Sequence, residues 1–142
     1  MDATTSPPPP STVSLDAVSI ELPLQLYWRD QDAYGHVNNG VYLRWFEEAR
    51  VRLFSEHLPD SILHMIVKAE INYRTAVEYP ADLSIRCWIA SSGNSSLILK
   101  YDIYKHSDGQ KSTVCDGSGV IVLWDQEQQC KRQVSDFFTT AG

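Results

Sequence analysis

The hydrophobic pattern of the chain changes its period between residues 27 and 50. Upstream, apolar residues occupy every second position, which is the period of a strand: Ile20, Leu22, Leu24, Leu26 and Trp28. Downstream, they recur at helical spacing: Tyr42, Trp45, Phe46, Ala49 and Leu53. We therefore predict a strand over about residues 18–28, a polar loop over 30–40, and a helix over about 40–57 that ends before Pro59.

The junction between loop and helix is the first candidate for a site. A helix start presents unpaired backbone N–H groups, and the preceding loop can present polar side chains beside them. Asn38 or Asn39 can cap the helix, because a short side-chain oxygen accepts from the first free N–H groups. Gly40 in the first turn allows a ligand or another chain to come close to the backbone.

The rest of the pattern predicts four antiparallel strands, over about residues 63–77, 83–89, 97–103 and 111–124. The first of these alternates between an apolar and a polar face, as a half-buried strand does. Turn signals separate the strands at residues 78–82, 91–94 and 107–109. Gly117 and Gly119 lie inside the last strand, where a missing side chain would let the helix approach closely.

The end of the chain is polar from residue 126 onwards, apart from three apolar residues that predict a short docking turn or helix: Val134, Phe137 and Phe138. No internal repeat is visible. The order of elements predicts an α+β domain in which one curled antiparallel sheet wraps around a long central helix.

The stretch DQDAYGHVNNGVYLRWFEEAR resembles the signature of the hotdog-fold acyl-CoA thioesterases of the 4-hydroxybenzoyl-CoA thioesterase type. The matching residues are Asp30, Asp32, Gly35, His36, Val37, Asn38, Asn39, Tyr42, Phe46, Glu47, Ala49 and Arg50. A looser likeness in the order of elements extends over roughly residues 18–125. The resemblance implies a hotdog fold, which is the same architecture that the periodicity predicts.

The composition limits the kinds of protein that this chain can be. A chain of 142 residues, 43% hydrophobic and 21% charged, suits one soluble globular domain. Residues 1–14, with four adjacent prolines, predict a disordered Pro/Ser/Thr-rich tail before a single domain over 15–142. The net charge of −6 argues against nucleic-acid binding, and no apolar run is long enough to cross a membrane.

The three cysteines, Cys87, Cys115 and Cys130, form no CxxC pair and no zinc spacing with the four histidines. We expect free thiols in a reducing, cytoplasmic compartment, no metal site and no cofactor.

Thioester hydrolysis needs a carboxylate that attacks or activates water, and donors that face the developing oxyanion. A loop aspartate before a helix start supplies the first, and the helix amides supply the second. The resemblance implies that Asp32 is the catalytic carboxylate and that Asn39, or its neighbour Gly40, provides the polarising amide. The alternative for Asp32 is a local Asx turn.

Other residues of the motif receive supporting roles. Asp30 could fix the loop by accepting backbone N–H bonds. Glu47 is either a second catalytic carboxylate or a solvated helix residue. His36 is either a loop donor or a titrating catalyst. We assign substrate contacts to His36, Asn38, Gly40 and Tyr42. Basic residues available for CoA phosphates are Arg44, Arg50, Arg52, Lys68, Arg74 and Arg86.

The leading hypothesis is a hydrolase that cleaves an acyl-CoA or acyl-carrier-protein thioester to a free carboxylic acid and a thiol. One alternative is a hotdog dehydratase with His36 as base and Glu47 as acid, although the Gly-His-Phe-Pro-Gly run of those enzymes is absent beyond Gly35-His36. Another is a non-catalytic acyl-binding domain. The resemblance also implies a homodimer, or a dimer of dimers, with Asp32 facing the second chain.

Overall fold

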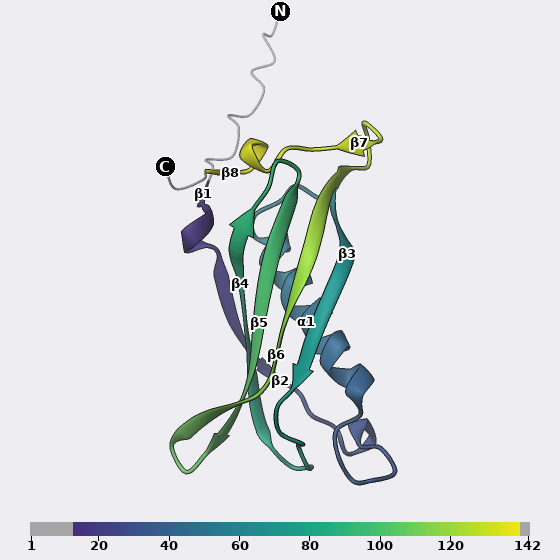
Figure 1. The fold of residues 1–142 in the computed structure, drawn as a ribbon, viewed down its shortest axis with the longest axis vertical. Coiled ribbons are helices and arrows are strands. Elements are labelled where there is room, and N and C mark those ends of the chain that lie inside the picture. Colours follow the sequence, from purple (N-terminus) through teal and green to yellow (C-terminus); the bar gives the residue numbers. More distant parts are fainter. Residues whose placement is uncertain (1–12, 140–142) are drawn as a thin grey trace, which may run out of the picture.

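The computed structural model describes residues 13–139, which form one curled sheet with a single long helix against its inner face (Figure 1). The strands are β1 (Val13–Ser14), β2 (Ser19–Leu24), β3 (Ile62–Tyr73), β4 (Asp82–Ser92), β5 (Ser96–Ser107), β6 (Gln110–Asp125), β7 (Cys130–Lys131) and β8 (Phe138–Thr139). The helix, α1, spans Asn39–Ser55, and three short 3-10 helices cover Leu15–Ala17, Trp28–Asp30 and Val134–Asp136. The main sheet has the order β2-β4-β5-β6-β3, and β7 adds a short pairing to β6.

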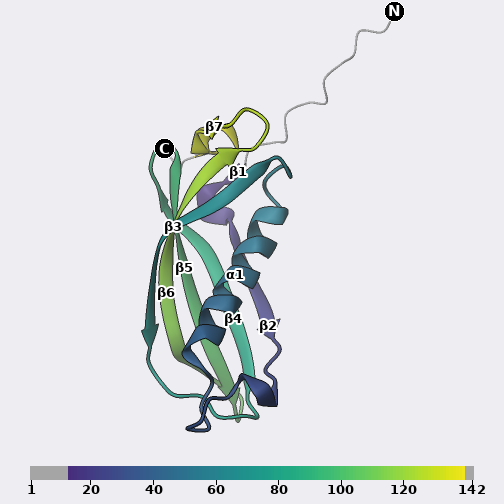
Figure 2. The same cartoon turned by 90° about the vertical axis from the view of Figure 1, so that its right-hand side faces the viewer.

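Helix α1 begins where the sequence predicts, because the Asn38 side chain accepts a hydrogen bond from the Gly40 N–H group at 2.9 Å. Its apolar residues recur every three or four positions and form the buried face: Tyr42, Trp45, Phe46, Ala49, Leu53 and Phe54. This face packs mainly over β4 and β2, and Figure 2 shows the helix lying along the hollow of the curled sheet.

The sheet covers that helix with alternate residues of its central strands. Leu83, Ile85, Cys87 and Ile89 of β4 are buried, as are Leu97, Leu99, Tyr101 and Ile103 of β5. The turn between β5 and β6 places Asp108 at φ 52° and Gly109 at φ 74°, the positive values that a two-residue hairpin turn of this type requires. The alternation predicted for these strands is therefore confirmed, with one face of each turned to the helix.

Gly117 marks the closest approach of the helix to the sheet. A Cβ atom at this position would overlap the Glu70 carbonyl oxygen and would lie 2.6 Å from Cε2 of Phe46. The Phe46 ring in turn stacks on Tyr101, with 4.2 Å between the ring centroids and 4° between the planes. The close approach predicted for this glycine is confirmed.

Two strand predictions are wrong at their ends. The first strand stops at Leu24, and Trp28, expected at an alternate buried position, is 73% exposed in a short 3-10 helix. The cause is Asp30, whose carboxylate accepts from the Tyr27 N–H group and turns the chain. The strand predicted over 63–77 ends at Tyr73.

The burial expected along β3 is also absent, since Met65 and Val67 are 49% and 62% exposed. This strand lies at the edge of the sheet, pairs with β6 and has a register shift between Ile66 and Lys68. It does not neighbour β4, so the segment around residues 78–82 is a crossing between the two sides of the sheet and not a hairpin turn. Local periodicity does not carry this long-range information.

The first and last strands of the described chain, β1 and β8, lie side by side. Val13–Ser14 form β1, which pairs in parallel with Phe138–Thr139, so the predicted tail is wrong for its last two residues. The other residues of that tail lie outside the described part of the chain. Val134 and Phe138 are each 1% exposed, which confirms the predicted docking turn. The hairpin to β7, which the sequence did not predict, is held by Asp125, which accepts from Arg132 Nη1 at 2.8 Å.

We predict that Gly117→Ala lowers the free energy of unfolding by about 1–3 kcal/mol, because Phe46 and the backbone of β3 must move to admit a methyl group. Gly119→Ala is the matched control, since the nearest atom to its Cβ would be the Tyr101 hydroxyl at 3.4 Å. Urea denaturation of both variants measures the difference, and equal stabilities would contradict the proposed contact.

Candidate functional site

The loop before α1 is built around the buried side chain of Asp30, which is 4% exposed. Its Oδ2 accepts from the Tyr27 N–H group at 2.9 Å, and its carboxylate lies 3.4 Å from Arg44 Nη2. Its carbonyl oxygen accepts from the Asn38 N–H group at 2.8 Å. Asp30 therefore joins both ends of the loop to the first turns of the helix, which is the loop-fixing role predicted from the sequence.

Asp32 makes the Asx turn that was the alternative to a catalytic role, but only with one oxygen. Its Oδ1 accepts from the Tyr34 N–H group at 2.8 Å and from the His36 N–H group at 3.3 Å. The Asp32 N–H group donates to the His36 carbonyl oxygen at 2.7 Å and closes the turn. No described residue donates to Oδ2, so the turn orients the carboxylate and leaves one oxygen available.

The helix start offers a single backbone donor beside this loop. Asn38 caps Gly40, so the Gly40 N–H group is occupied. The next N–H group, of Val41, donates to the Asn38 carbonyl oxygen at 3.0 Å. Within residues 13–139, no acceptor lies within hydrogen-bond range of the Asn39 N–H group. Of the two amides considered from the sequence, the one that can meet a ligand oxygen in this structure is that of Asn39.

Of the remaining residues predicted to contact the substrate, His36 lies near the surface and Tyr42 in the core. His36 is part-exposed, and its Nε2 lies 3.9 Å from Glu78 Oε1. Tyr42 is 3% exposed, with its ring edge-on to those of Trp45 and Tyr73. Burial raises the pKa of its hydroxyl to about 12. Tyr42 therefore supports the helix start from the core and offers almost no surface to a ligand.

A hollow of about 440 Å³ lies beside Asp32 and is lined by Trp28, Arg29, Gln31, Asp32, Ala33 and Gly35. Trp28 and Tyr34 expose most of their rings, and the Arg29 guanidinium lies 4.6 Å from the centroid of the Tyr27 ring. Trp28 and Arg29 were not among the predicted site residues, because Trp28 was expected to lie in a strand. The signal that could have found them is the turn chemistry of Asp30, three residues after Tyr27.

Glu47 lies elsewhere, in a second cavity of about 220 Å³ between α1 and β3. Its walls are Leu43, Phe46, Glu47, Arg50, Ile66, Ala69, Tyr101 and Ser118. Glu47 follows Asn39 by eight residues, which is a rise of about 12 Å along the helix. The structure therefore groups Glu47 with Arg50 and not with Asp32 or His36.

Arg50 was expected among the basic residues at the surface, and for this residue the prediction is wrong. It is 8% exposed, and its Nη1 donates to the Tyr101 hydroxyl at 3.2 Å. The helical spacing of its neighbours could have revealed this, since Arg50 follows Phe46 by four positions on the buried face.

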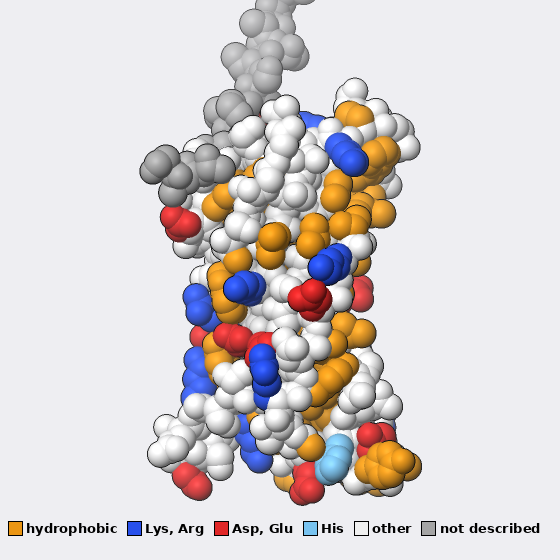
Figure 3. All heavy atoms as spheres, in the orientation of Figure 1, with side chains coloured by type: hydrophobic (Ala, Val, Ile, Leu, Met, Phe, Trp, Pro, Cys, Tyr) orange, Lys and Arg blue, Asp and Glu red, His pale blue; other side chains and the backbone are white. Residues whose placement is uncertain are grey.

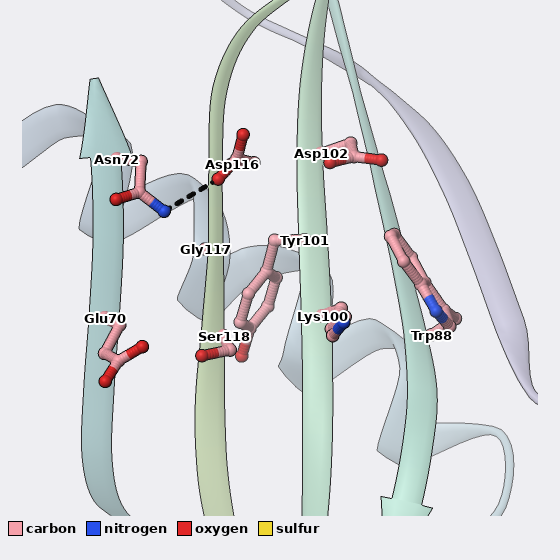
Figure 4. A pocket seen from close by; sticks show the side chains of 9 residues that line it. All are labelled: Glu70, Asn72, Trp88, Lys100, Tyr101, Asp102, Asp116, Gly117 and Ser118. Carbon is pink, nitrogen blue, oxygen red and sulfur yellow. Dashed lines mark hydrogen bonds between the residues drawn. The ribbon is translucent and has the colours of Figure 1, made fainter. Parts of the chain in front are cut away.

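The outer face of the sheet holds another hollow, of about 390 Å³, on the side opposite the helix. Figure 3 shows Lys, Arg, Asp and Glu side chains interspersed across the middle of this face. In Figure 4, Asn72 donates to Asp116, while Lys100 and Trp88 stand on the neighbouring strands. The Arg74 guanidinium bonded to Asp116 lowers the pKa of that carboxyl. This hollow contains none of the residues of the loop motif.

Comparison with known proteins agrees with the fold and with the loop motif described above. The model of the thioesterase-like superfamily matches residues 26–141. The chain belongs to this superfamily. Thioester hydrolysis is therefore its class of activity, and the resemblance noted from the loop motif is confirmed. No curated protein sequence matches the chain.

Three solved structures illustrate the likeness of this thioesterase-like chain. A putative acyl-CoA thioesterase from Xanthomonas campestris is 30% identical, with 72% of this chain and 90% of that chain covered and a TM-score of 0.65. 4-Hydroxybenzoyl-CoA thioesterase from Pseudomonas sp. strain CBS-3 is 20% identical, with coverages of 83% and 93% and a TM-score of 0.72. DHNA-CoA thioesterase from Staphylococcus aureus is 17% identical, with coverages of 84% and 83% and a TM-score of 0.70. The last two show the shared hotdog fold.

Within residues 13–139, no helix has the length and apolar character needed to span a membrane. In the same part of the chain, His, Cys, Asp and Glu side chains do not gather in groups of three or more that could hold a metal ion. The cysteines Cys87, Cys115 and Cys130 are free thiols, as expected.

The two aspartates of the motif should respond differently to the same substitution. We predict that Asp30→Asn lowers the free energy of unfolding by about 1–3 kcal/mol, because an amide group would place a donor against Tyr27 N–H or Arg44. Asp32→Asn is the matched control and should change it by less than about 0.5 kcal/mol, since its Oδ1 can still accept within the turn. Thermal and urea denaturation measure both. Equal losses would contradict the division of roles.

Proposed function

We propose that this enzyme hydrolyses an acyl thioester of coenzyme A or of an acyl-carrier protein, releasing a carboxylic acid and a thiol. Asp32 would act on the thioester carbonyl carbon, either by direct attack or by taking a proton from the attacking water. The observation that carries the proposal is the free Oδ2 of Asp32 in a loop that leads directly to the uncapped Asn39 N–H group. A carboxylate and an amide donor are the two parts that the reaction needs.

The hydrogen bonds of the loop support this assignment. Two backbone N–H groups hold Oδ1, so the carboxylate is oriented before a substrate arrives. The Asn39 amide would donate to the carbonyl oxygen and stabilise the negative charge that develops on it. The partial positive charge of the helix N-terminus adds to this effect. In direct attack, the Asp32 carboxylate would form a mixed anhydride with the acyl group and expel the thiolate, which takes a proton from water; a second water would then hydrolyse the anhydride to the carboxylic acid and restore Asp32. As a base, Asp32 would take a proton from the attacking water and return it to the leaving thiolate.

The dehydratase alternative needs His36 and Glu47 in one site. His36 lies beside Glu78, while Glu47 lines the cavity between α1 and β3. Glu47 therefore lines a cavity that His36 does not reach, and this arrangement favours hydrolysis through Asp32. In this proposal Glu47 and His36 have no part in proton transfer. The cytoplasmic location stays a prediction that rests on the free cysteines.

We also propose a homodimer that completes the site. The outer edge of β3 is unpaired within the described part of the chain, and it exposes four large apolar side chains: Met65, Ile66, Val67 and Tyr73. Leu43 and Val51 of α1 are exposed on the helix next to it. An apolar edge of this length is a liability unless it is covered. Pairing of two β3 edges would cover it and would supply a second wall near the Asp32 loop. A dimer of dimers would leave this contact unchanged.

We predict that Asp32→Asn lowers kcat by at least about 10²-fold with acyl-CoA substrates, the range attributed to positioned acid–base groups. His36→Ala is the comparison variant and should retain most of kcat, because this proposal gives its side chain no part in proton transfer. Release of free thiol measures both. If the asparagine variant keeps wild-type turnover while folded, Asp32 is not the catalytic carboxylate. Loss of activity in His36→Ala alone would favour the dehydratase arrangement.

We predict that Val67→Lys converts the dimer to a monomer at micromolar concentration and lowers activity with it, because a charge on an edge strand opposes pairing. Ile98→Lys is the matched control. It places the same charge on β5, a strand inside the sheet, where Ile98 is 38% exposed. Light scattering gives the mass of each variant. A wild-type protein that is a fully active monomer would exclude both the dimer and the shared site.

A further inference from the structure

Tyr73, the last residue of β3, is bonded to the first residue of α1. Its hydroxyl donates to the Asn39 carbonyl oxygen at 3.0 Å. Within residues 13–139, this is the only side-chain hydrogen bond that joins the sheet to the first turn of the helix. The residue that receives it is the one whose N–H group is free to meet a substrate oxygen. The sheet therefore holds the proposed oxyanion donor through the carbonyl group of the same residue.

The first turn of α1 needs support from outside the helix. Gly40 lies in it, and glycine is unfavourable in a helix because its backbone has more freedom to lose. The Asn38 side chain caps Gly40, and the Asn38 carbonyl oxygen accepts from Val41. Neither bond reaches the carbonyl oxygen of Asn39. With the bond from Tyr73, both peptide groups that flank Asn39 are fixed.

The end of β3 that carries Tyr73 is itself held firmly. Its neighbours Asn72 and Arg74 both donate to the Asp116 carboxylate on β6, each at 2.8 Å, and Figure 4 shows the bond from Asn72. The Tyr73 ring lies edge-on to that of the buried Tyr42, with 5.3 Å between the centroids. Burial raises the pKa of the Tyr73 hydroxyl, so the group stays protonated and remains a donor at neutral pH. The hydroxyl is therefore a fixed point for the helix start.

The direction of a donor determines how well it stabilises a charge that develops during a reaction. Oxyanion donors are effective because they are oriented before the charge appears and need no rearrangement at that moment. A displacement of about 1 Å can cost about 10²-fold in rate. The bond from Tyr73 is exposed to water in the described chain, so it adds little to the stability of the fold. Its main effect is on the orientation of Asn39.

We propose that Tyr73 is a positioning residue for hydrolysis: its hydroxyl anchors Asn39 to the end of β3 and keeps the Asn39 N–H group directed at the thioester carbonyl oxygen. This inference rests on the proposed thioester hydrolysis. Tyr73 acts through Asn39 and does not touch the reacting atoms. Its loss therefore affects the transition state, in which the oxyanion forms, more than it affects binding of the ground state.

The kinetic test removes only the hydroxyl. Tyr73→Phe should lower kcat about 10-fold with acyl-CoA substrates and leave KM within about 2-fold, as expected when an interaction made in the transition state is weakened. Tyr104→Phe is the matched control, because it also removes one hydroxyl donor, to Asp102 at 3.1 Å on the outer face of the sheet. It should keep wild-type kcat and KM. Release of free thiol measures turnover, and light scattering should show that both variants keep the wild-type mass.

Amide hydrogen exchange tests the anchor without turnover. The N–H groups of Gly40 and Val41 are bonded within the first turn, so their exchange reports on how firmly this turn is held. Followed by NMR, both should exchange at least about 3-fold faster in Tyr73→Phe than in the wild type. Tyr104→Phe should leave their rates unchanged. If Tyr73→Phe does not fold, Asp116→Ala is the second variant, since it frees the end of β3 and should cause the same two effects.

The outcomes separate this inference from the proposed function. Wild-type kcat in Tyr73→Phe, a rise in KM without a fall in kcat, or an equal loss in Tyr104→Phe would each overturn it. A change of mass in Tyr73→Phe would also overturn it, because the residue would then act through assembly. Unchanged exchange of Gly40 and Val41 would show that the turn does not depend on the bond. If the wild type hydrolyses no thioester while exchange becomes faster in Tyr73→Phe, the anchor is supported and only the proposed reaction is contradicted.

Discussion

The contact between Phe46 and Gly117 sets the distance between the helix and the sheet. Because the ring lies where a side chain of β6 would be, α1 sits deep in the hollow of the sheet. The Phe46 ring also stacks on Tyr101, which accepts the one hydrogen bond of the Arg50 side chain. The depth of the helix therefore determines both where its first free amide is presented and how far Arg50 is removed from water.

The loop motif shows how two aspartates separated by one residue acquire opposite roles from their surroundings. Asp30 is buried, bonded through its side chain and its backbone, and placed beside Arg44. Asp32 is turned outward, with two amides on one oxygen and none on the other. A saturated buried carboxylate stabilises the loop, whereas a half-bonded one at the rim of a hollow can still react. The same backbone turn produces both environments.

The features that sequence could predict are those that depend on neighbours along the chain. Helical spacing located α1 and its buried face, and turn residues located the hairpins, for example at Asp108 and Gly109. Which strand lies at the edge depends on pairing between distant segments, so the exposure of Val67 was not predictable from its alternation. In the candidate site, the motif indicated Asp32 and the helix start. The choice between the Asn39 and Gly40 amides required the geometry of the Asn38 cap.

Arg50 is the position of α1 where the hydrophobic pattern and the type of residue disagree. Four residues after Phe46, its position belongs to the apolar stripe of the helix, where a guanidinium is costly. A sequence that specifies one structure tends to avoid such conflicts, and those that persist concentrate at functional sites. The other members of this stripe pack in the hydrophobic core, and Arg50 meets the one polar group beside it, since its Nη1 donates to the buried hydroxyl of Tyr101.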